Sequence, residues 1–355
     1  MNEAVQTAVV GVTGYVGAEL ARLLLRHPRL KGLPPVFAGR LDEKDAAQGG
    51  VPLVEIHPHL VDSNGSGSLK LRPFSWNLLA ERGVKVLFLA TPHEQSREWV
   101  PEAMARGLKV IDLSGAWRLN DAANRAIYAF KDSDASHAAQ TQAQAVYGLP
   151  ELHRAEIAAA HLVANPGCYA TSVILPLRPL VAAGVIDLEA GIIADAKSGV
   201  SGSGKAPTAK THFMYAADNL SAYGVFSHRH TGELLEQIGL HASQIVFTPH
   251  LLPIPRGILS TIYVRFREPQ THESVSGLYH AFFKGSPMVR LYGTALPQIQ
   301  YSVRTNYADI GFQLSADGSR AVIVSCLDNL LKGASGQAVQ NLNVMMGWGE
   351  AEGLE

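Results

Sequence analysis

The sequence predicts a two-domain α/β fold, with a doubly wound parallel sheet first and an α+β domain second. A chain of 355 residues exceeds what one hydrophobic core normally organises. Its opening alternates short apolar strand patterns with a helical pattern, which is typical of parallel βαβ units. From about residue 169 the strand patterns become longer and alternate between apolar and polar residues. We therefore expect a mixed or antiparallel sheet in the second domain.

The first three expected elements are a strand, a helix and a second strand. Residues 7–12 form an apolar, β-branched run, and residues 14–26 carry apolar side chains at helical spacing. Residues 34–38 then have the composition of a second strand. This succession predicts the start of a Rossmann-type sheet with helices on both of its faces.

Two further buried strands are expected in this domain, at residues 84–90 and 108–113. Ligands of open α/β sheets bind at the edge that the carboxyl ends of the parallel strands share. We therefore expect the residues that follow these two strands to contact a bound ligand, namely Thr91, Pro92, His93 and Ser114. The composition of segment 62–68 predicts a flexible loop, and the polar segment 131–145 is expected to be a surface connection.

The second domain carries strand patterns at residues 244–247, 260–266 and 321–326, with helix-like stretches between them. Residues 334–346 have the pattern of an apolar helix. This mixture of strands and helices predicts the α+β class.

The composition excludes several classes of protein. The formal net charge is −1 and no basic stripe is present, so we expect no nucleic-acid partner. No apolar run is long enough to span a membrane, and the first residues have the pattern of a strand rather than of a secretion signal. Cys168 and Cys326 are too few cysteines for a disulfide framework, which favours a reducing compartment, the cytoplasm.

The first strand–helix turn carries glycines three residues apart, at Gly11, Gly14 and Gly17. A dinucleotide pyrophosphate must approach backbone N–H groups at a helix N-terminus, where Cβ atoms would block it. The turn therefore predicts a dinucleotide site that also includes Thr13, Tyr15 and Val16. Thr13 stands where the commoner G-x-G-x-x-G pattern has a glycine, and a tight turn that binds nothing is the alternative.

The residue after the second strand favours NADP(H) over NAD(H). An acidic residue at the end of that strand would accept hydrogen bonds from a ribose 2′-hydroxyl, whereas a basic residue pairs with a 2′-phosphate. Here the strand leads into Arg40, although Asp42 and Glu43 follow closely. The alternative for Arg40 is a solvated loop charge.

Cys168 is the candidate nucleophile. It follows Asn165-Pro166-Gly167, a turn sequence, and precedes a long apolar helix pattern. At a helix N-terminus the helix dipole stabilises a thiolate. Cys326 lies inside an apolar strand pattern and is expected to be an inert core residue.

Residues 228–233 (HRHTGE) combine two imidazoles, a guanidinium and a carboxylate. A cysteine nucleophile needs a proton acceptor and donor, and the pKa of histidine suits that role, although the residues alone favour neither His228 nor His230. Arg229 could bind an anionic substrate group, and Glu233 could orient an imidazole. A metal site is the alternative use of two such histidines, but no second ligand pair at metal spacing accompanies them.

Two further segments are rich in glycine and backbone donors. Residues 196–205 (AKSGVSGSGK) could wrap a phosphate or cofactor, and the residues expected to do so are Lys197, Ser198, Gly199 and Gly202. A flexible hinge is the alternative for this segment. Residues 328–336 lead into the last helix pattern, and Asn329 could direct a polar group towards the nicotinamide.

In combination and order, these motifs resemble the N-acetyl-gamma-glutamyl-phosphate reductase family over nearly the whole chain. The matching segments are GVTGYVGAEL at 11–20, YGLPELHR at 147–154, NPGCYAT at 165–171, AKSGVSGSGK at 196–205, HRHTGE at 228–233, PHLLPIPRGI at 249–258 and DNLLKGASGQAVQN at 328–341.

The resemblance implies roles for particular residues. Cys168 would be the nucleophile, His228 rather than His230 the acid/base, and Asn165 part of the substrate site. Gly232 stands where the family usually has proline, which is expected to loosen the turn without removing any chemistry. The family fold implies that residues 1–168 and 329–355 form the NADP-binding domain and residues 169–328 the catalytic domain.

The resemblance also implies a reaction, in arginine biosynthesis. N-acetyl-L-glutamyl 5-phosphate would acylate Cys168 with release of phosphate, and hydride from NADPH would reduce the thioester to N-acetyl-L-glutamate 5-semialdehyde. His228 would take the thiohemiacetal proton as the aldehyde leaves. Two-domain dehydrogenases of this size usually associate, so we expect a homodimer or homotetramer.

Several alternatives stay open on the sequence alone. Aspartate-semialdehyde dehydrogenase shares the expected fold and chemistry. A reductase of the longer aminoadipyl phosphate, or of a carrier-linked substrate, would differ only in its pocket. A cysteine acyl hydrolase would keep Cys168 and His228 but would have no use for the glycine turn. A dinucleotide-sensing protein would keep that turn and could lose Cys168 without effect.

Overall fold

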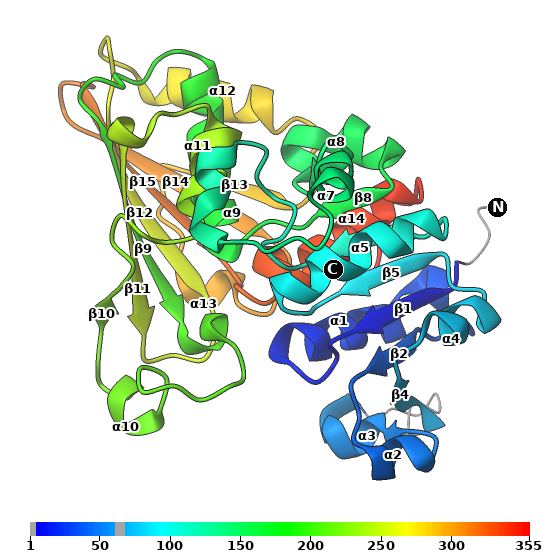
Figure 1. Ribbon diagram of the computed structural model, residues 1–355. Helices are drawn as coiled ribbons and strands as arrows, with labels where there is room; N and C mark the ends of the chain where they lie inside the picture. The colour runs from blue at the N-terminus through cyan, green and yellow to red at the C-terminus, as the bar shows by residue number, and fades with distance from the viewer. Residues whose placement is uncertain (1–4, 61–67) are drawn as a thin grey trace. The chain divides into compact units, whose positions relative to one another are not determined.

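The computed structural model describes residues 5–60 and 68–355 and divides the chain into two compact units (Figure 1). The first unit takes the chain up to Arg118 together with Phe130–Asn165 and Ser335–Glu355. The second takes Leu119–Ala129 and Pro166–Ala334. Each unit is built around one sheet. No helix among the described residues has the length and hydropathy needed to cross a membrane.

The first unit is built on an eight-stranded sheet in the order β3-β4-β2-β1-β5-β6-β8-β7. All its strand pairs are parallel except β3 with β4. The strands are β1 (Thr7–Val10), β2 (Val36–Gly39), β3 (Val51–Pro52), β4 (Lys70–Pro73), β5 (Val86–Leu89), β6 (Lys109–Asp112), β7 (Ala145–Tyr147) and β8 (Leu162–Ala164). The predicted doubly wound parallel sheet is therefore confirmed.

The central strands of this sheet, β1, β5, β6 and β8, are short and apolar because both of their faces are covered. All four residues of β1 and of β5 are buried. The helices of this unit are α1 (Tyr15–Arg26), α2 (Glu43–Ala47), α3 (Leu53–Ile56), α4 (Trp76–Glu81), α5 (His93–Ala105), α7 (Ala135–Gln142), α8 (Pro150–Ala159) and α14 (Gly336–Met345). Every residue of α14 is buried, and the Asn341 side chain donates to the Gly148 carbonyl oxygen at 2.8 Å.

Residues 131–145 are not the surface connection that the sequence predicted. They contain α7, whose first turn is capped by the Asp134 carboxylate accepting from the His137 backbone N–H at 2.9 Å. The alanines and glutamines that suggested a polar connection are good helix formers, and Ala138, Thr141 and Gln142 are buried. The loop expected at 62–68 lies outside the described residues except for Ser68.

The second unit is built on a seven-stranded mixed sheet in the order β10-β11-β9-β12-β15-β14-β13. Only β11 with β9 and β13 with β14 are parallel. The strands are β9 (Ile192–Gly199), β10 (Ser221–Ala222), β11 (Ile245–Leu252), β12 (Ile258–Arg265), β13 (Val289–Gly293), β14 (Ala308–Leu314) and β15 (Arg320–Leu327). The predicted α+β class with a mixed sheet is confirmed.

The two faces of this sheet differ in exposure along β9, β11 and β12, whereas most of β14 is buried on both faces. The helices of this unit are α6 (Ala122–Arg125), α9 (Cys168–Ala182), α10 (Phe213–Ala216), α11 (Thr231–Ile238), α12 (His272–Phe282) and α13 (Ile299–Ser302). α9 packs on the sheet, where Ser172 and Ser260 share a buried hydrogen bond at 2.7 Å. Along β9 and β12 buried residues alternate with more exposed ones, so the two faces differ in exposure.

Ala196–Gly199 belong to β9, although the sequence suggested that this segment forms a loop. The strand continues to Gly199 because β11 and β12 pair with it on both sides. The donor-rich loop therefore begins at Val200, as a short 3₁₀ turn.

Two glycines of the first turn should respond differently to added side chains. A Cβ at Gly17 would lie 2.2 Å from the Gly11 carbonyl oxygen, whereas a Cβ at Gly14 meets nothing nearer than 3.9 Å. We expect Gly17→Ala to lower the free energy of unfolding by about 1–3 kcal/mol, although alanine is the better helix former. Gly14→Ala should change it by less than about 0.5 kcal/mol. Urea denaturation measures both, and equal effects would contradict the packing role assigned to Gly17.

Candidate active site

The turn between β1 and α1 brings backbone close to backbone. Gly11 has a φ of 94°, and a Cβ there would lie 2.2 Å from the Ala90 carbonyl oxygen. The N-cap of α1 is Gly14, which is extended and has no side chain to cap the helix. The first-turn N–H groups of α1 are thus suited to an anion such as a pyrophosphate.

A cavity of about 550 Å³ lies over this turn in the first unit. Its volume is within the range typical of cofactor sites. Since a Cβ at Gly14 would meet no atom nearer than 3.9 Å, this glycine leaves backbone open towards the space. The predicted cofactor residues that line the cavity are Gly11, Thr13, Gly14, Arg40, Thr91 and Pro92.

Four other predicted cofactor residues of this unit have different surroundings. Gly17 is closely packed against Gly11, and the Val16 carbonyl oxygen accepts from the Ser335 hydroxyl at 2.7 Å. The His93 imidazole lies 2.9 Å from the Glu94 carboxylate. The Ser114 hydroxyl donates to the buried Asp112 carboxylate at 2.7 Å. These four residues and Tyr15 are absent from the cavity lining.

Phe74, Gln95 and Trp99 are among the lining residues that the sequence did not predict. Phe74 and Trp99 stack with their ring centroids 4.3 Å apart, and Gln95 lies one helical turn before Trp99 on α5. Because α5 begins directly after Thr91-Pro92, the i and i+4 spacing of Gln95 and Trp99 was a signal that could have found both.

In the second unit Cys168 is half-buried and is the first residue of α9. The preceding residue, Gly167, donates its backbone N–H to the Glu233 carboxylate at 2.8 Å, and Glu233 is wholly buried on α11. The His230 imidazole lies directly against Gly167, where a Cβ would be 2.4 Å from Nε2. The fold therefore gathers Cys168, His230 and Glu233 around one glycine.

Gly232, which the sequence suggested would loosen this region, is buried in the first turn of α11. A Cβ there would lie 2.9 Å from Leu119 Cδ1 and 3.1 Å from Asn124 Cβ. Glycine at this position therefore allows α11 to approach the segment 119–124. The Glu236 carboxylate of the same helix accepts from the Asn120 N–H at 2.8 Å.

His228 lies inside a group of aromatic rings. The centroids of Tyr169, Tyr223 and Phe247 are each 5.5 Å from its ring, and that of His230 is 4.7 Å away. Burial, with a smaller contribution from the nearby His230, lowers the pKa of His228 to about 3, and Glu233 opposes this shift. The His228 imidazole is therefore neutral near pH 7.

A backbone contact also selects the tautomer of His228. The His230 N–H donates to His228 Nδ1 at 3.2 Å. A neutral ring whose Nδ1 accepts a hydrogen bond carries its proton on Nε2. His228 thus presents an N–H donor through Nε2.

The hydroxyls of Tyr169 and Tyr223 complete this aromatic group. The Tyr169 hydroxyl donates to the His250 carbonyl oxygen at 2.6 Å, and the Tyr223 hydroxyl lies 3.5 Å from that of Tyr169. Burial raises the pKa of Tyr223 to about 12 and also raises the pKa of Tyr169. Both hydroxyls are therefore protonated donors, and the sequence alone had not placed either of them.

The predicted substrate residues lie in different places. Arg229 is exposed, with its guanidinium 5.8 Å from the centre of the Tyr128 ring. Lys197 projects from the sheet face opposite to α9 and forms an ion pair with Asp195 at 2.8 Å. Ser198 is buried, and its hydroxyl donates to the Gly199 carbonyl oxygen. Asn165 is buried in the first unit, where its side-chain oxygen accepts from Asn341 at 3.0 Å.

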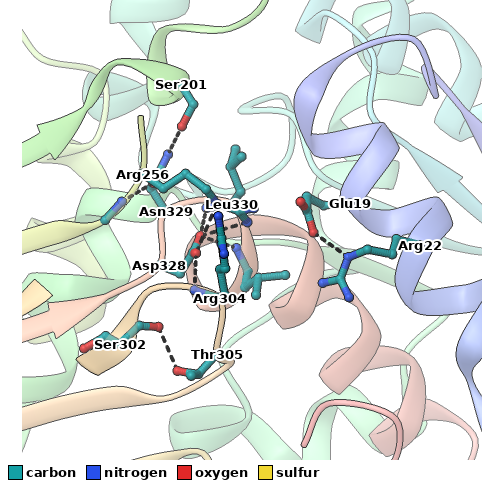
Figure 2. Close-up of polar contacts among 12 residues, drawn as sticks. Glu19, Arg22, Ser201, Arg256, Ser302, Arg304, Thr305, Asp328, Asn329 and Leu330 are labelled. Atoms are coloured by element: carbon teal, nitrogen blue, oxygen red, sulfur yellow. Dashed lines mark hydrogen bonds and ion pairs between the residues drawn. The ribbon is translucent and has the colours of Figure 1, made fainter. Parts of the chain in front are cut away.

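The remaining predicted cofactor residues lie together in the second unit. The Asn329 side chain donates to the Ser201 hydroxyl at 2.9 Å and accepts from the Gly257 N–H at 2.7 Å (Figure 2). A Cβ at Gly199 would lie 2.7 Å from the Arg256 nitrogen, and one at Gly202 would lie 3.7 Å from the Asn329 amide. The Asn329 side chain therefore joins the segment that carries Ser201 to the segment that carries Gly257. Within residues 5–60 and 68–355, no cluster of three or more His, Cys, Asp or Glu residues is arranged to hold a metal ion.

Comparison with known proteins identifies the family. A family model described as "Semialdehyde dehydrogenase, NAD binding domain" matches residues 6–160, and one described as "Semialdehyde dehydrogenase, dimerisation domain" matches residues 168–329. The N-acetyl-gamma-glutamyl-phosphate reductase of Desulfotalea psychrophila is 42% identical, covering 99% of this chain and 98% of that protein. The chain belongs to the N-acetyl-gamma-glutamyl-phosphate reductase family. The family resemblance seen in the sequence is therefore confirmed.

Solved structures support the fold. Aspartate semialdehyde dehydrogenase II of Vibrio cholerae, complexed with ASA, superposes with a TM-score of 0.69 at 18% identity, covering 97% of this chain and 98% of that one. Aspartate semialdehyde dehydrogenase with NADP from Candida albicans gives 0.67 at 16% identity, covering 96% and 98%. At these identities the likeness shows a common fold alone. The description of the first family model gives the cofactor class, a nicotinamide dinucleotide.

The low pKa of His228 should make the stability of the protein depend on pH. Between pH 6.5 and about 3 the unfolded chain binds a proton at this residue that the folded chain does not. The free energy of unfolding should therefore fall as the pH is lowered through this range. His228→Gln should reduce that slope, measured by urea denaturation at several pH values. The exposed His280→Gln controls for the loss of an imidazole, and an unchanged slope in His228→Gln would contradict the burial argument.

Proposed function

We propose that this protein reduces N-acetyl-L-glutamyl 5-phosphate to N-acetyl-L-glutamate 5-semialdehyde and phosphate, with NADPH as reductant and through a thioester on Cys168. The observation that carries the proposal is the gathering of Cys168, His230 and Glu233 around Gly167 at the start of α9. Membership of the family over nearly the whole chain supports the choice of substrate. The reaction is a step of arginine biosynthesis.

The N-terminus of α9 activates the nucleophile. Backbone N–H groups and the helix dipole at this end stabilise the Cys168 thiolate. The thiolate attacks the acyl carbonyl, the C–S bond forms, and the C–O bond to phosphate breaks with its electron pair leaving on phosphate. The thioester keeps the carbonyl electrophilic, and the thiolate is a competent leaving group in the second half of the reaction.

Glu233 and His230 hold the turn that presents the thiolate. The buried Glu233 carboxylate accepts the Gly167 N–H, and His230 packs on the other side of the same glycine. Their proposed role is to hold the Cys168 sulfur in position. This matters because a misplacement of the sulfur by 1 Å can reduce the rate by about a hundredfold.

His228 acts on the carbonyl oxygen. With the ring neutral and its proton on Nε2, it donates a hydrogen bond to the oxygen that gains negative charge when sulfur or hydride adds. The resulting thiohemiacetal oxyanion reforms the carbonyl and expels the Cys168 thiolate. This differs from the role that the family resemblance implied, in which His228 removes a proton from the thiohemiacetal.

The first unit binds NADP(H). The nicotinamide supplies the hydride when it is bound. Gly11, Thr13 and Gly14 with the N-terminus of α1 hold the pyrophosphate, and Arg40 pairs with the 2′-phosphate at the cavity wall. In the second unit the exposed Arg229 is the proposed partner of an anionic substrate group.

The open sheet face of the second unit is the proposed contact between copies of the chain. Ile193, Val246 and Tyr263 are exposed on it by 51%, 38% and 45%. Apolar side chains gathered on a sheet face mark interaction sites, and the family model of this unit is described as a dimerisation domain. We therefore propose a homodimer or homotetramer. A free cysteine as nucleophile favours a reducing compartment, the cytoplasm.

The test is the reverse reaction, followed by NADPH absorbance with N-acetylglutamate semialdehyde, NADP and phosphate. Wild type and Cys326→Ser should both form NADPH in a phosphate-dependent manner, whereas Cys168→Ser should lose activity by several orders of magnitude. Turnover by Cys168→Ser would overturn the proposal. So would turnover of aspartate semialdehyde by a wild-type protein that does not turn over N-acetylglutamate semialdehyde.

The cofactor preference should depend on Arg40. Loss of a charge-assisted contact costs about 1.5–3 kcal/mol, which corresponds to a weakening of about ten- to a hundredfold. We expect Arg40→Ala to raise the Kd of NADPH by that factor and to leave the Kd of NADH nearly unchanged. The fluorescence of the bound nicotinamide measures both. Lys44→Ala, an exposed charge on α2, is the matched control, and equal losses for both cofactors in Arg40→Ala would contradict the assignment.

A further inference from the structure

We propose that Asp328 is a positioning residue for Cys168, acting through the turn that its carboxylate organises. The inference rests on the proposed function, because it takes Cys168 to be the nucleophile. The sequence motif at 328–336 contains Asp328 but predicted no role for it. It follows β15 directly, and its side chain is wholly buried.

Asp328 first shapes its own turn. Its Oδ1 accepts from the backbone N–H groups of Leu330 at 2.8 Å and Leu331 at 3.1 Å (Figure 2). Its main-chain carbonyl oxygen accepts from the Gly333 N–H at 2.9 Å. Residues 328–333 are therefore closed into a compact turn around one aspartate.

The same carboxylate holds two other segments of the second unit. Arg256 approaches it with Nε 3.1 Å from Oδ2 and Nη2 3.2 Å from Oδ1. The Arg304 backbone N–H donates to Oδ2 at 2.7 Å, and Arg304 has a left-handed φ of 66°. Figure 2 shows both arginines converging on Asp328. Asp328 thus fixes the turn relative to the loops that carry Arg256 and Arg304.

The far end of the turn touches the nucleophile. A Cβ at Gly333 would lie 2.7 Å from Cys168 Cβ and 3.3 Å from Cys168 Cα. Only a hydrogen atom fits between the two residues, so the backbone of the turn forms one wall of the Cys168 site. A displacement of the turn must therefore move the thiol or open a gap beside it.

Stability alone does not explain this buried ion pair. Desolvation of a buried carboxylate and guanidinium offsets most of their attraction, so such pairs contribute little net stability. What the pair supplies is a fixed geometry, with both carboxylate oxygens engaged in contacts of defined direction. Asn329 extends this geometry by tying Ser201 and Gly257 to the same turn.

The test is Asp328→Asn in the full-length protein. The amide keeps the size and one acceptor oxygen, but its NH₂ group cannot accept the hydrogen bond from the Arg304 backbone N–H, and it carries no charge to pair with Arg256. We expect kcat to fall by about ten- to a hundredfold with little change in the KM for NADPH. The pH profile of Cys168 alkylation by iodoacetamide, followed by peptide mass spectrometry, should also shift. Cys326, which is buried and whose pKa is raised to about 12, is the internal reference.

Asp309→Asn is the matched control. Asp309 is also wholly buried, receives Arg290 through Nε at 2.6 Å and Nη2 at 2.8 Å, and accepts from the Ser302 hydroxyl at 2.6 Å. Its own contacts do not include the 328–333 turn. We expect a comparable loss of stability but wild-type kcat and an unchanged Cys168 profile. If Asp309→Asn reproduces the effects of Asp328→Asn, the positioning role is overturned.

Gly333→Ala tests the contact with Asp328 intact. Its added methyl group should press on Cys168, reproduce the kcat loss and shift the alkylation profile. If Asp328→Asn fails to fold, Gly333→Ala decides whether the 328–333 turn positions Cys168. Wild-type kcat and alkylation in Gly333→Ala overturn the inference, provided that Cys168→Ser is inactive. Phosphate-dependent activity of Cys168→Ser would instead overturn the proposed function, and with it the premise of the inference.

Discussion

The site depends first on the hydrogen bond from the Gly167 N–H to the Glu233 carboxylate. A wholly buried carboxylate requires donors, and this one takes a donor from the residue that precedes Cys168. The bond joins the start of α9 to α11, and the His230 ring fills the space that a side chain at position 167 would need. Glycines at 167 and 232 follow from the same close packing.

Some glycines of this protein allow close packing, whereas Gly14 leaves space. Gly11, Gly17 and Gly333 each lie where a Cβ would collide with backbone or with Cys168. Gly14 instead faces the open space over α1. The first group brings segments together, and the second exposes backbone to a ligand. The glycine turn of α1 thus meets two different physical requirements. Gly11 and Gly17 allow close packing, and Gly14 leaves its backbone open.

Local patterns were sufficient to predict much of the fold and part of the site. Apolar runs located β1, β5 and β6, and the turn before Cys168 located the start of α9. The face of β9 from which Lys197 projects could not be read locally, because it depends on pairing with β11 and β12. The aromatic rings around His228 and the contacts of Asp328 join residues far apart in the chain. Asp328 and Arg256, for example, are 72 positions apart.

The central claim is a covalent intermediate on Cys168, and an acyl-enzyme burst without phosphate tests it most directly. Wild-type protein mixed with N-acetylglutamate semialdehyde and NADP should form about one NADPH per active site and then stop. Quenched samples should carry the N-acetylglutamyl group on the Cys168 peptide, and added phosphate should remove it and restart turnover. Steady turnover in phosphate with no burst and an unmodified Cys168 peptide would contradict the account.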